Sequence, residues 1–326
     1  MNKIVFIIPY FGKFNNYFQL FLNSCKKNKD IADWLILTDD KRSFEYPTNV
    51  HVEYTDWETF RNFLQSKFDF KISVDRPYKL CDLKPMYGFI FYERIKEYKY
   101  WGHCDTDLIW GNLSYFLTDD VLSNDKIFSL GHCTLYKNTK ENNCCFMLPL
   151  DGTERYKEVL STFNNCSFDE EYNKSINCIY ESYGKTVFYK EFEFNVYTKS
   201  SYFRRTYLKD DRSYFVEKKE HSFITWEDGR LYKNSLTKSS LSKCMELKKE
   251  EFLYIHMQSR PMKVCFSLNP EIHVFKIVPN AFEQIEEYPV TQDNFGKIKW
   301  YHLNLHYFRL RSKNLYLKIK KRIQHK

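Results

Sequence analysis

The chain opens with short strand-like runs, the first two almost wholly apolar, that alternate with segments of helical periodicity. Residues 4–8, 34–37 and 50–54 have the length and composition of buried or half-buried strands. Residues 15–26 and 57–68 instead repeat apolar side chains at helical spacing. This alternation predicts an α/β fold with right-handed β-α-β crossovers and a Rossmann-like sheet, mixed but mostly parallel, flanked by helices.

Ligands of such sheets bind beyond the carboxyl ends of the strands. The rule selects two groups of residues here. Pro9, Tyr10 and Phe11 close the first apolar run, and Asp39 and Asp40 follow the second. We therefore expect ligand contacts from both groups.

Two carboxylates, Asp105 and Asp107, follow an aromatic-rich run that we predict to be a further strand. Positions i and i+2 of an extended segment point to the same side, so both acids can face one cation. Mg²⁺ and Mn²⁺ prefer such oxygen ligands. Either ion could bridge the two phosphates of a nucleotide-sugar and stabilise the leaving diphosphate. An isolated Asp-x-Asp is otherwise most often a solvated turn.

Lys79, Asp82 and Lys84 precede a helical pattern over residues 86–95 that leads toward this pair. A lysine beside a diphosphate supplies a compact positive charge, so the three side chains are candidates for the same pocket. The alternative is an ordinary helix boundary with solvated lysines.

Asp169, Glu170 and Glu171 stand together at the start of an apparent helix. Acids in a first helical turn meet the positive end of the helix dipole, which is a structural role. One of them could instead be the general base that deprotonates an acceptor hydroxyl. The sequence does not choose among the three.

His256 lies in a short alternating strand, and Lys263 follows it. An imidazole combined with carboxylate oxygens suits manganese, so His256 is a candidate metal ligand and Lys263 a candidate cation for the nucleotide. A histidine in a strand is more often a hydrogen-bonded structural residue.

The net charge of +8 is concentrated at the C-terminus, where no acid occurs from Asn294 onward. Apolar residues are interleaved with the basic ones in a partly helical rhythm. Such a segment either lies on an anionic membrane surface or packs on the body of the protein. No recognition motif for nucleic acid accompanies it.

Ten cysteines are scattered without any Cys-x-x-Cys, which favours buried reduced thiols in the cytoplasm over zinc sites or disulfides. No apolar stretch has the length of a membrane span. We expect a cytoplasmic protein, with peripheral attachment to the inner face of the membrane as an option for the tail.

Several segments together resemble bacterial glycosyltransferases of the GT-A fold, of the capsule and lipopolysaccharide type. The similarity extends over roughly residues 1–265 and is to an uncharacterised subgroup. It rests on residues 8–12, 37–40, 78–85, 103–107, 129–132 and 254–258.

The resemblance implies a nucleotide-sugar donor, with a UDP-sugar favoured, and a glycan or lipid-linked oligosaccharide as acceptor in surface polysaccharide synthesis. Residues 9–11 and Asp39 or Asp40 would contact the nucleoside. Lys84 would contact the diphosphate or ribose, and Asp105 the ribose or donor sugar.

The resemblance further implies that Asp107 and His256 hold a Mn²⁺ or Mg²⁺ ion. Residues 1–125 would be the nucleotide-sugar half of one domain, 126–275 the half that binds acceptor and completes the metal site, and 276–326 a basic amphipathic extension. Two other functions remain open from the residues: a metal-dependent phosphohydrolase, and a non-enzymatic protein that binds membrane surfaces or polyanions.

Overall fold

The computed structural model describes residues 3–170, 172–209, 211–238, 245–268 and 271–324. They form two compact units. Unit 1 extends to Glu191 except for Ile109–Gly111, and unit 2 comprises Ile109–Gly111 together with the chain from Phe192. These units are defined by packing, and the functional division at residues 125 and 275 stays a prediction.

Unit 1 is built on a seven-stranded sheet with the order β3-β2-β1-β4-β7-β6-β8. Strands β1, β2, β3 and β4 pair in parallel, as do β6 and β8, whereas β7 is antiparallel to both β4 and β6. The predicted mixed, mostly parallel sheet is thus confirmed. The strands are β1 (Ile4–Tyr10), β2 (Ala32–Thr38), β3 (Val50–Tyr54), β4 (Tyr100–Cys104), β6 (Lys126–Ile127), β7 (Cys133–Lys137) and β8 (Val187–Phe188).

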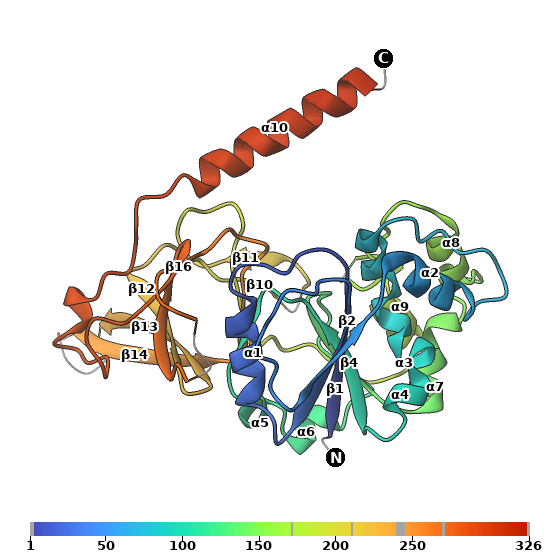
Figure 1. Ribbon diagram of the computed structural model, residues 1–326, viewed down its shortest axis with the longest axis horizontal. Coiled ribbons are helices and arrows are strands. Elements are labelled where there is room, and N and C mark those ends of the chain that lie inside the picture. The colour runs from blue at the N-terminus through green and yellow to red at the C-terminus, as the bar shows by residue number, and fades with distance from the viewer. Residues whose placement is uncertain (1–2, 171, 210, 239–244, 269–270, 325–326) are drawn as a thin grey trace. The chain divides into compact units, whose positions relative to one another are not determined.

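Helices cover both faces of this sheet, with α1 on one side and α3, α4 and α7 on the other (Figure 1). The helical segments of unit 1 are α1 (Phe18–Lys26), α2 (Trp57–Gln65), η1 (Pro77–Met86), α3 (Tyr87–Ile90), α4 (Tyr92–Ile95), α5 (Leu113–Phe116), α6 (Asp119–Leu122), α7 (Lys140–Cys144), η2 (Cys145–Met147), α8 (Arg155–Ser161) and α9 (Ile176–Ser182).

Both faces of β1 are buried, which explains its continuous apolar composition. Val5 and Ile7 join a large core cluster that includes side chains of α2, α3 and α8. Phe6 points to the opposite face by the twofold alternation of a strand, and stacks on Trp34 of β2 with ring centroids 5.5 Å apart. Apolar packing on two sides fixes the sheet and therefore the position of its carboxyl-terminal edge.

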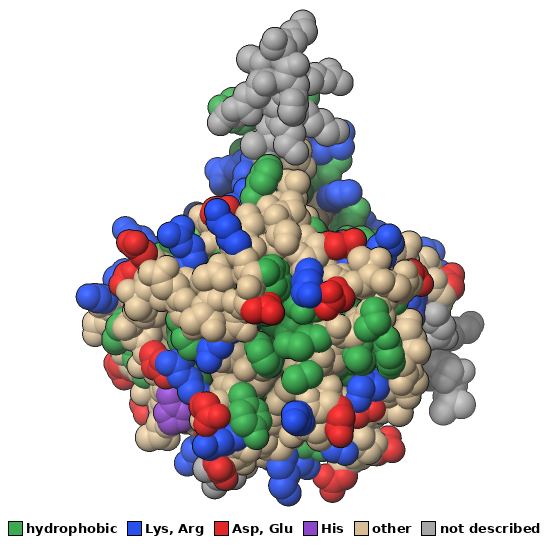
Figure 2. All heavy atoms as spheres, turned by 90° about the vertical axis from the view of Figure 1, so that its right-hand side faces the viewer, with side chains coloured by type: hydrophobic (Ala, Val, Ile, Leu, Met, Phe, Trp, Pro, Cys, Tyr) green, Lys and Arg blue, Asp and Glu red, His purple; other side chains and the backbone are tan. Residues whose placement is uncertain are grey.

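Aromatic side chains also extend from the core cluster toward the surface of unit 1. Seen from the side of α2, α8 and α9, apolar side chains gather near the middle of the face (Figure 2). Partly buried aromatic residues packed against the core are Phe11, Trp57, Phe63, Phe68, Phe70, Phe89 and Tyr98.

Unit 2 is mainly β-structure. Its largest sheet has six strands in the order β14-β13-β12-β17-β18-β16, and a smaller sheet has the order β5-β15-β9. The strands are β5 (Leu108–Trp110), β9 (Phe194–Asn195), β10 (Thr206–Leu208), β11 (Tyr214–Val216), β12 (Ser222–Glu227), β13 (Arg230–Lys238), β14 (Met245–Phe252), β15 (Tyr254–His256), β16 (Lys263–Val264), β17 (Val274–Val278) and β18 (Ala281–Glu283).

The C-terminal part of unit 2 contains a turn of 3-10 helix, η3 (Phe295–Lys297), and the long helix α10 (His306–Gln324). Leu303, Phe308 and Leu315 are exposed in and just before α10. Among the residues that the structure describes, no helix is both long enough and apolar enough to cross a bilayer.

Candidate functional site

Asp105 and Asp107 directly follow β4, at the carboxyl-terminal edge of the parallel strands. The Nζ atom of Lys84 lies 2.8 Å from Oδ1 of Asp105 and donates to the carbonyl of Gly131 at 2.8 Å. Burial alone would lower the pKa of Lys84, but the charges of Asp105 and Asp169 outweigh it and raise the pKa well above its usual value. Lys84 is therefore a fixed cation beside the first carboxylate of the pair.

Tyr10 and Tyr17 lie within electrostatic reach of Asp107. Burial raises the pKa of both phenols, and the negative charge of Asp107 raises it further. Asn15 supports the turn between the two acids, because its Nδ2 donates to the carbonyl of Thr106 at 3.2 Å. A divalent cation would neutralise the negative potential that Asp107 creates here.

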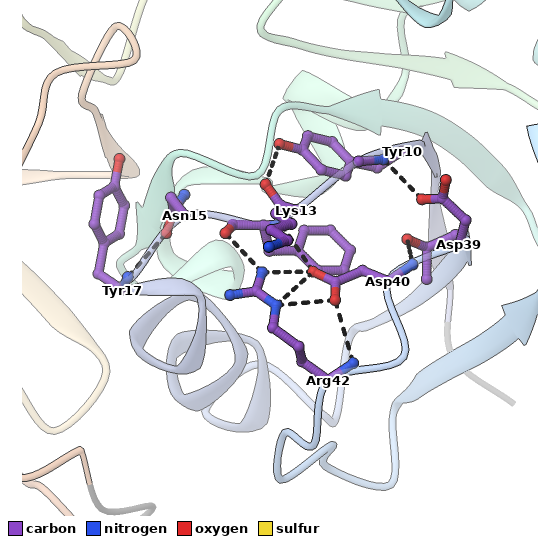
Figure 3. Close-up of polar contacts among 10 residues, drawn as sticks. Tyr10, Lys13, Asn15, Tyr17, Asp39, Asp40 and Arg42 are labelled. Atoms are coloured by element: carbon purple, nitrogen blue, oxygen red, sulfur yellow. Dashed lines mark hydrogen bonds and ion pairs between the residues drawn. The ribbon is translucent and has the colours of Figure 1, made fainter.

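Asp39 and Asp40 follow β2, and the structure gives them different surroundings (Figure 3). Oδ1 of Asp39, which is exposed, accepts from the backbone N–H of Gly12 at 2.7 Å. Asp40 is buried, and its carboxylate accepts from Nε of Arg42 at 2.9 Å and from the backbone of Phe14 at 2.9 Å. The hydrogen bond from Arg42 lowers the pKa of Asp40 to about 2.

Gly12 has φ +112°, a conformation that side chains rarely adopt, so glycine suits this bend after β1. Tyr10 stacks on Phe14 at 4.6 Å, and its hydroxyl donates to the carbonyl of Lys13 at 3.1 Å. Pro9 lies within β1, paired with Leu37.

The ring of Phe11 turns toward α2. Its centroid lies 5.1 Å from that of Trp57 and 4.9 Å from that of Phe60, and its side chain remains partly exposed. Tyr10, Phe11, Asp39 and Asp40 thus lie at the ends of adjacent parallel strands, where the sequence predicts ligand contacts.

Lys79 and Asp82 form a buried ion pair whose remaining contacts are with the protein backbone. Nζ of Lys79 lies 2.8 Å from the Asp82 carboxylate and also donates to the carbonyls of Val159 and Asn164. Asp82 in turn accepts from the backbone N–H groups of Cys166 and Phe168. This pair holds the segment that leads to Asp169.

Asp169 is 2% exposed and approaches Lys84, with a distance of 3.5 Å between its Oδ2 and Nζ. Burial raises the pKa of Asp169 to about 6, although the charge of Lys84 opposes the shift. A Cβ at Gly131 would lie 2.5 Å from Oδ2 of Asp169 and 2.9 Å from Oε1 of Glu170, so both acids pack closely on this glycine.

The prediction that these acids open a helix is wrong, because α9 begins only at Ile176. Asp169 and Glu170 lie in a turn instead, and Glu170 is partly exposed. Glu171 lies outside the described residues.

His256 ends β15 in unit 2. Its Nδ1 is 3.1 Å from Oδ1 of Asn195 in the neighbouring strand β9. Lys263, the first residue of β16, is exposed, and its backbone N–H donates to Asn280 at 2.8 Å.

The sequence did not point to several residues of the site. Arg42 follows Asp40 at i+2, a spacing that could have suggested the ion pair. Asn15 gives no such signal, and neither does the buried Lys126, which lies within electrostatic reach of Asp169. Burial lowers the pKa of Lys126 to about 7, an effect that the charge of Asp169 partly opposes.

These features describe an α/β protein with an acidic site and a fixed lysine at the carboxyl ends of parallel strands. The chain belongs to DUF6625, a family of unknown function, which it matches over residues 6–286. No curated protein matches it in sequence.

Similar solved structures include the galactosyltransferase LgtC in complex with donor and acceptor sugar analogues. It is 14% identical, with a TM-score of 0.29, and the match covers 59% of this chain and 75% of that one. Another is the glycosyltransferase GlyE of Streptococcus pneumoniae TIGR4, 12% identical with a TM-score of 0.28, where the match covers 61% of this chain and 48% of that one. At such low TM-scores the likeness assigns no activity to this chain.

Proposed function

We propose that this protein is a metal-dependent glycosyltransferase that moves a sugar from a nucleotide-sugar, with a UDP-sugar favoured, to a glycan or lipid-linked acceptor in surface polysaccharide synthesis. The observation that carries the proposal is the contact between Lys84 and Asp105 at the end of β4. It puts a fixed cation beside an Asp-x-Asp pair, at the sheet edge where α/β proteins bind nucleotides.

The metal ligands in this proposal are Asp105, Asp107 and His256, and the ion is Mn²⁺ or Mg²⁺. Two carboxylates and an imidazole form a donor set that could hold such an ion. Asp107 directly precedes β5 in the sequence, and β5 lies in the same small sheet as β15, which ends at His256. When bound, the metal would neutralise the charge that develops on the leaving diphosphate.

The remaining residues would bind and orient the donor. Tyr10, Phe11 and Asp39 would contact the nucleoside, since they lie at the ends of β1 and β2. Lys84 would contribute positive charge to the diphosphate while Asp169 keeps its ammonium group in place. Asp40 would act indirectly, because Arg42 already occupies its carboxylate.

An inverting reaction would require a base for the acceptor hydroxyl. Of the two described acids that directly follow Phe168, Glu170 is more exposed than Asp169 and is the better candidate for this role. In a retaining reaction no side chain would take that proton directly, and both acids would be structural.

The test is calorimetric titration with UDP, with and without Mn²⁺, on the wild type and on Asp107→Ala. We expect metal-dependent UDP binding that the substitution reduces to the level without metal. Asp30→Ala is the control, because Asp30 is an exposed acid in the turn before β2 and should leave binding unchanged. Failure of the wild type to bind UDP, GDP, CMP or dTDP would refute the proposal.

We also propose that α10 attaches the protein to anionic lipid. The segment from Asn294 contains no acid, and Leu303, Leu305, Phe308 and Leu315 are exposed. Each basic residue near such a surface contributes about 1 kcal/mol. Neutralising Arg309, Arg311 and Lys313 with glutamine should therefore weaken binding to phosphatidylglycerol vesicles by roughly a hundredfold. Equal binding to phosphatidylcholine vesicles would contradict this proposal.

A further inference from the structure

Strands β9 and β15 bring an asparagine opposite the proposed metal-binding histidine. The two strands are parallel, and their register pairs Asn195 with His256. Paired residues in neighbouring strands project to the same face of a sheet. Oδ1 of Asn195 accordingly lies 3.1 Å from Nδ1 of His256, and the asparagine is 3% exposed.

A second donor identifies the role of this amide oxygen. Nε2 of Gln258 donates to Oδ1 of Asn195 at 2.6 Å. Because Oδ1 can only accept, the ring nitrogen that faces it carries the hydrogen. In a neutral imidazole, a hydrogen on Nδ1 leaves the lone pair on Nε2, and the lone pair is what binds a metal.

The turn after His256, which carries Gln258, has an unfavourable backbone conformation. Gln258 and Ser259 have φ of +54° and +53°, the left-handed region that non-glycine residues seldom occupy. The turn is closed by Arg260, whose backbone N–H donates to Met257 at 2.9 Å and whose guanidinium contacts Asn280 at 3.1 Å. Residues held in this way often lie at functional sites.

We propose that Asn195 is a positioning residue that fixes the tautomer and ring orientation of His256 for metal binding, with Gln258 holding the asparagine in turn. This inference rests on the proposed function, because it assumes that His256 is a metal ligand. Metal-binding histidines usually donate their second ring N–H to such an acceptor, and loss of the acceptor weakens the metal about 10- to 100-fold.

The experiment measures Mn²⁺ alone binding to the full chain, by electron paramagnetic resonance of the free ion. Asn195→Ala should weaken binding about 10- to 100-fold. Asn195→Asp should restore it, because a carboxylate oxygen accepts the same Nδ1 hydrogen. The matched control is Asn234→Ala, since Asn234 is equally buried in unit 2 but donates to Thr225 rather than contacting His256.

A second readout follows the tautomer directly. In nitrogen NMR spectra of histidine-labelled protein, the signal assigned to His256 by its loss in His256→Gln should report hydrogen on Nδ1. Asn195→Ala should shift that signal toward the other tautomer, which a purely structural role would not do.

The outcomes are distinguishable. Unchanged Mn²⁺ affinity in Asn195→Ala, or failure of Asn195→Asp to restore it, overturns the inference and leaves the proposed metal site standing. Absence of Mn²⁺ binding in the wild type overturns the inference together with the metal-dependent function.

Discussion

The buried pair of Lys79 and Asp82 should control the stability of the segment that carries Asp169. Lys79→Met keeps the length of the side chain and removes its charge, while Asp82 remains fully buried. Removing one partner of a buried ion pair costs about 3–5 kcal/mol, because the other charge is left uncompensated. Asp82 would still accept two backbone hydrogen bonds, so we expect the lower end, about 3 kcal/mol.

The assay is urea unfolding monitored by tryptophan fluorescence, together with amide hydrogen exchange. A loss of this size corresponds to a Tm decrease of roughly 6–12 °C for a domain the size of unit 1. Exchange should accelerate at residues 164–170, because Lys79 contacts the carbonyl of Asn164 and Asp82 accepts from Phe168.

Lys157→Met is the matched control. Lys157 also forms an ion pair, 2.7 Å from Glu154, but the two side chains are 42% and 51% exposed. Solvent screens such pairs, so this variant should unfold like the wild type. If Lys79→Met were as stable as Lys157→Met, the reasoning about the buried pair would be refuted.

Two further changes test the electrostatics of the site. Arg42→Met should raise the pKa of Asp40 from about 2 toward its usual value, so the variant should be about 1 kcal/mol less stable above pH 4, after allowance for the half-exposed Arg42. The stability difference between variant and wild type should shrink as pH falls from 4 to 2, which urea unfolding at several pH values would measure. A difference that does not change with pH would contradict the prediction. The pKa of Asp169 is raised to about 6, so its ionisation destabilises the fold above pH 6 and this cost disappears as pH falls toward 4. Asp169→Asn should therefore be about 1–3 kcal/mol more stable than the wild type at pH 7.5 and similar to it at pH 4. An equal stability difference at both pH values would show that it does not come from ionisation of Asp169.

Local sequence predicted the fold best where strands are buried on both faces. Residues 4–8 lie within β1, because a continuous apolar run leaves no other stable arrangement. Residues 50–54 also coincide with a strand, β3, although that strand contains His51 and Glu53 and is only partly buried. Strand β14 gave no comparable signal. Its sequence is mostly charged, since it is the outer strand of the six-stranded sheet and exposes much of its length.

The candidate site also contains residues whose positions the sequence predicted and residues whose positions it did not predict. The positions of Tyr10, Asp39 and Asp105 follow from the rule that ligands bind at strand ends, and the strands themselves were predicted. The surroundings of Lys79 were not predictable, because its backbone partners Val159 and Asn164 are far away in sequence. Asp169 lies in a turn rather than a helix because the backbone before it is bound by Asp82.

The placement of β5 has a consequence for how the chain folds during synthesis. Ile109 and Trp110 are fully buried, and they belong to unit 2 although unit 1 surrounds them in sequence. Their neighbouring strand β15 can form only after residues 254–256 have left the ribosome. This apolar segment therefore stays unpaired while most of the chain is translated. A fragment ending at Glu191 would never receive that partner, and we expect it to aggregate rather than fold as an independent domain.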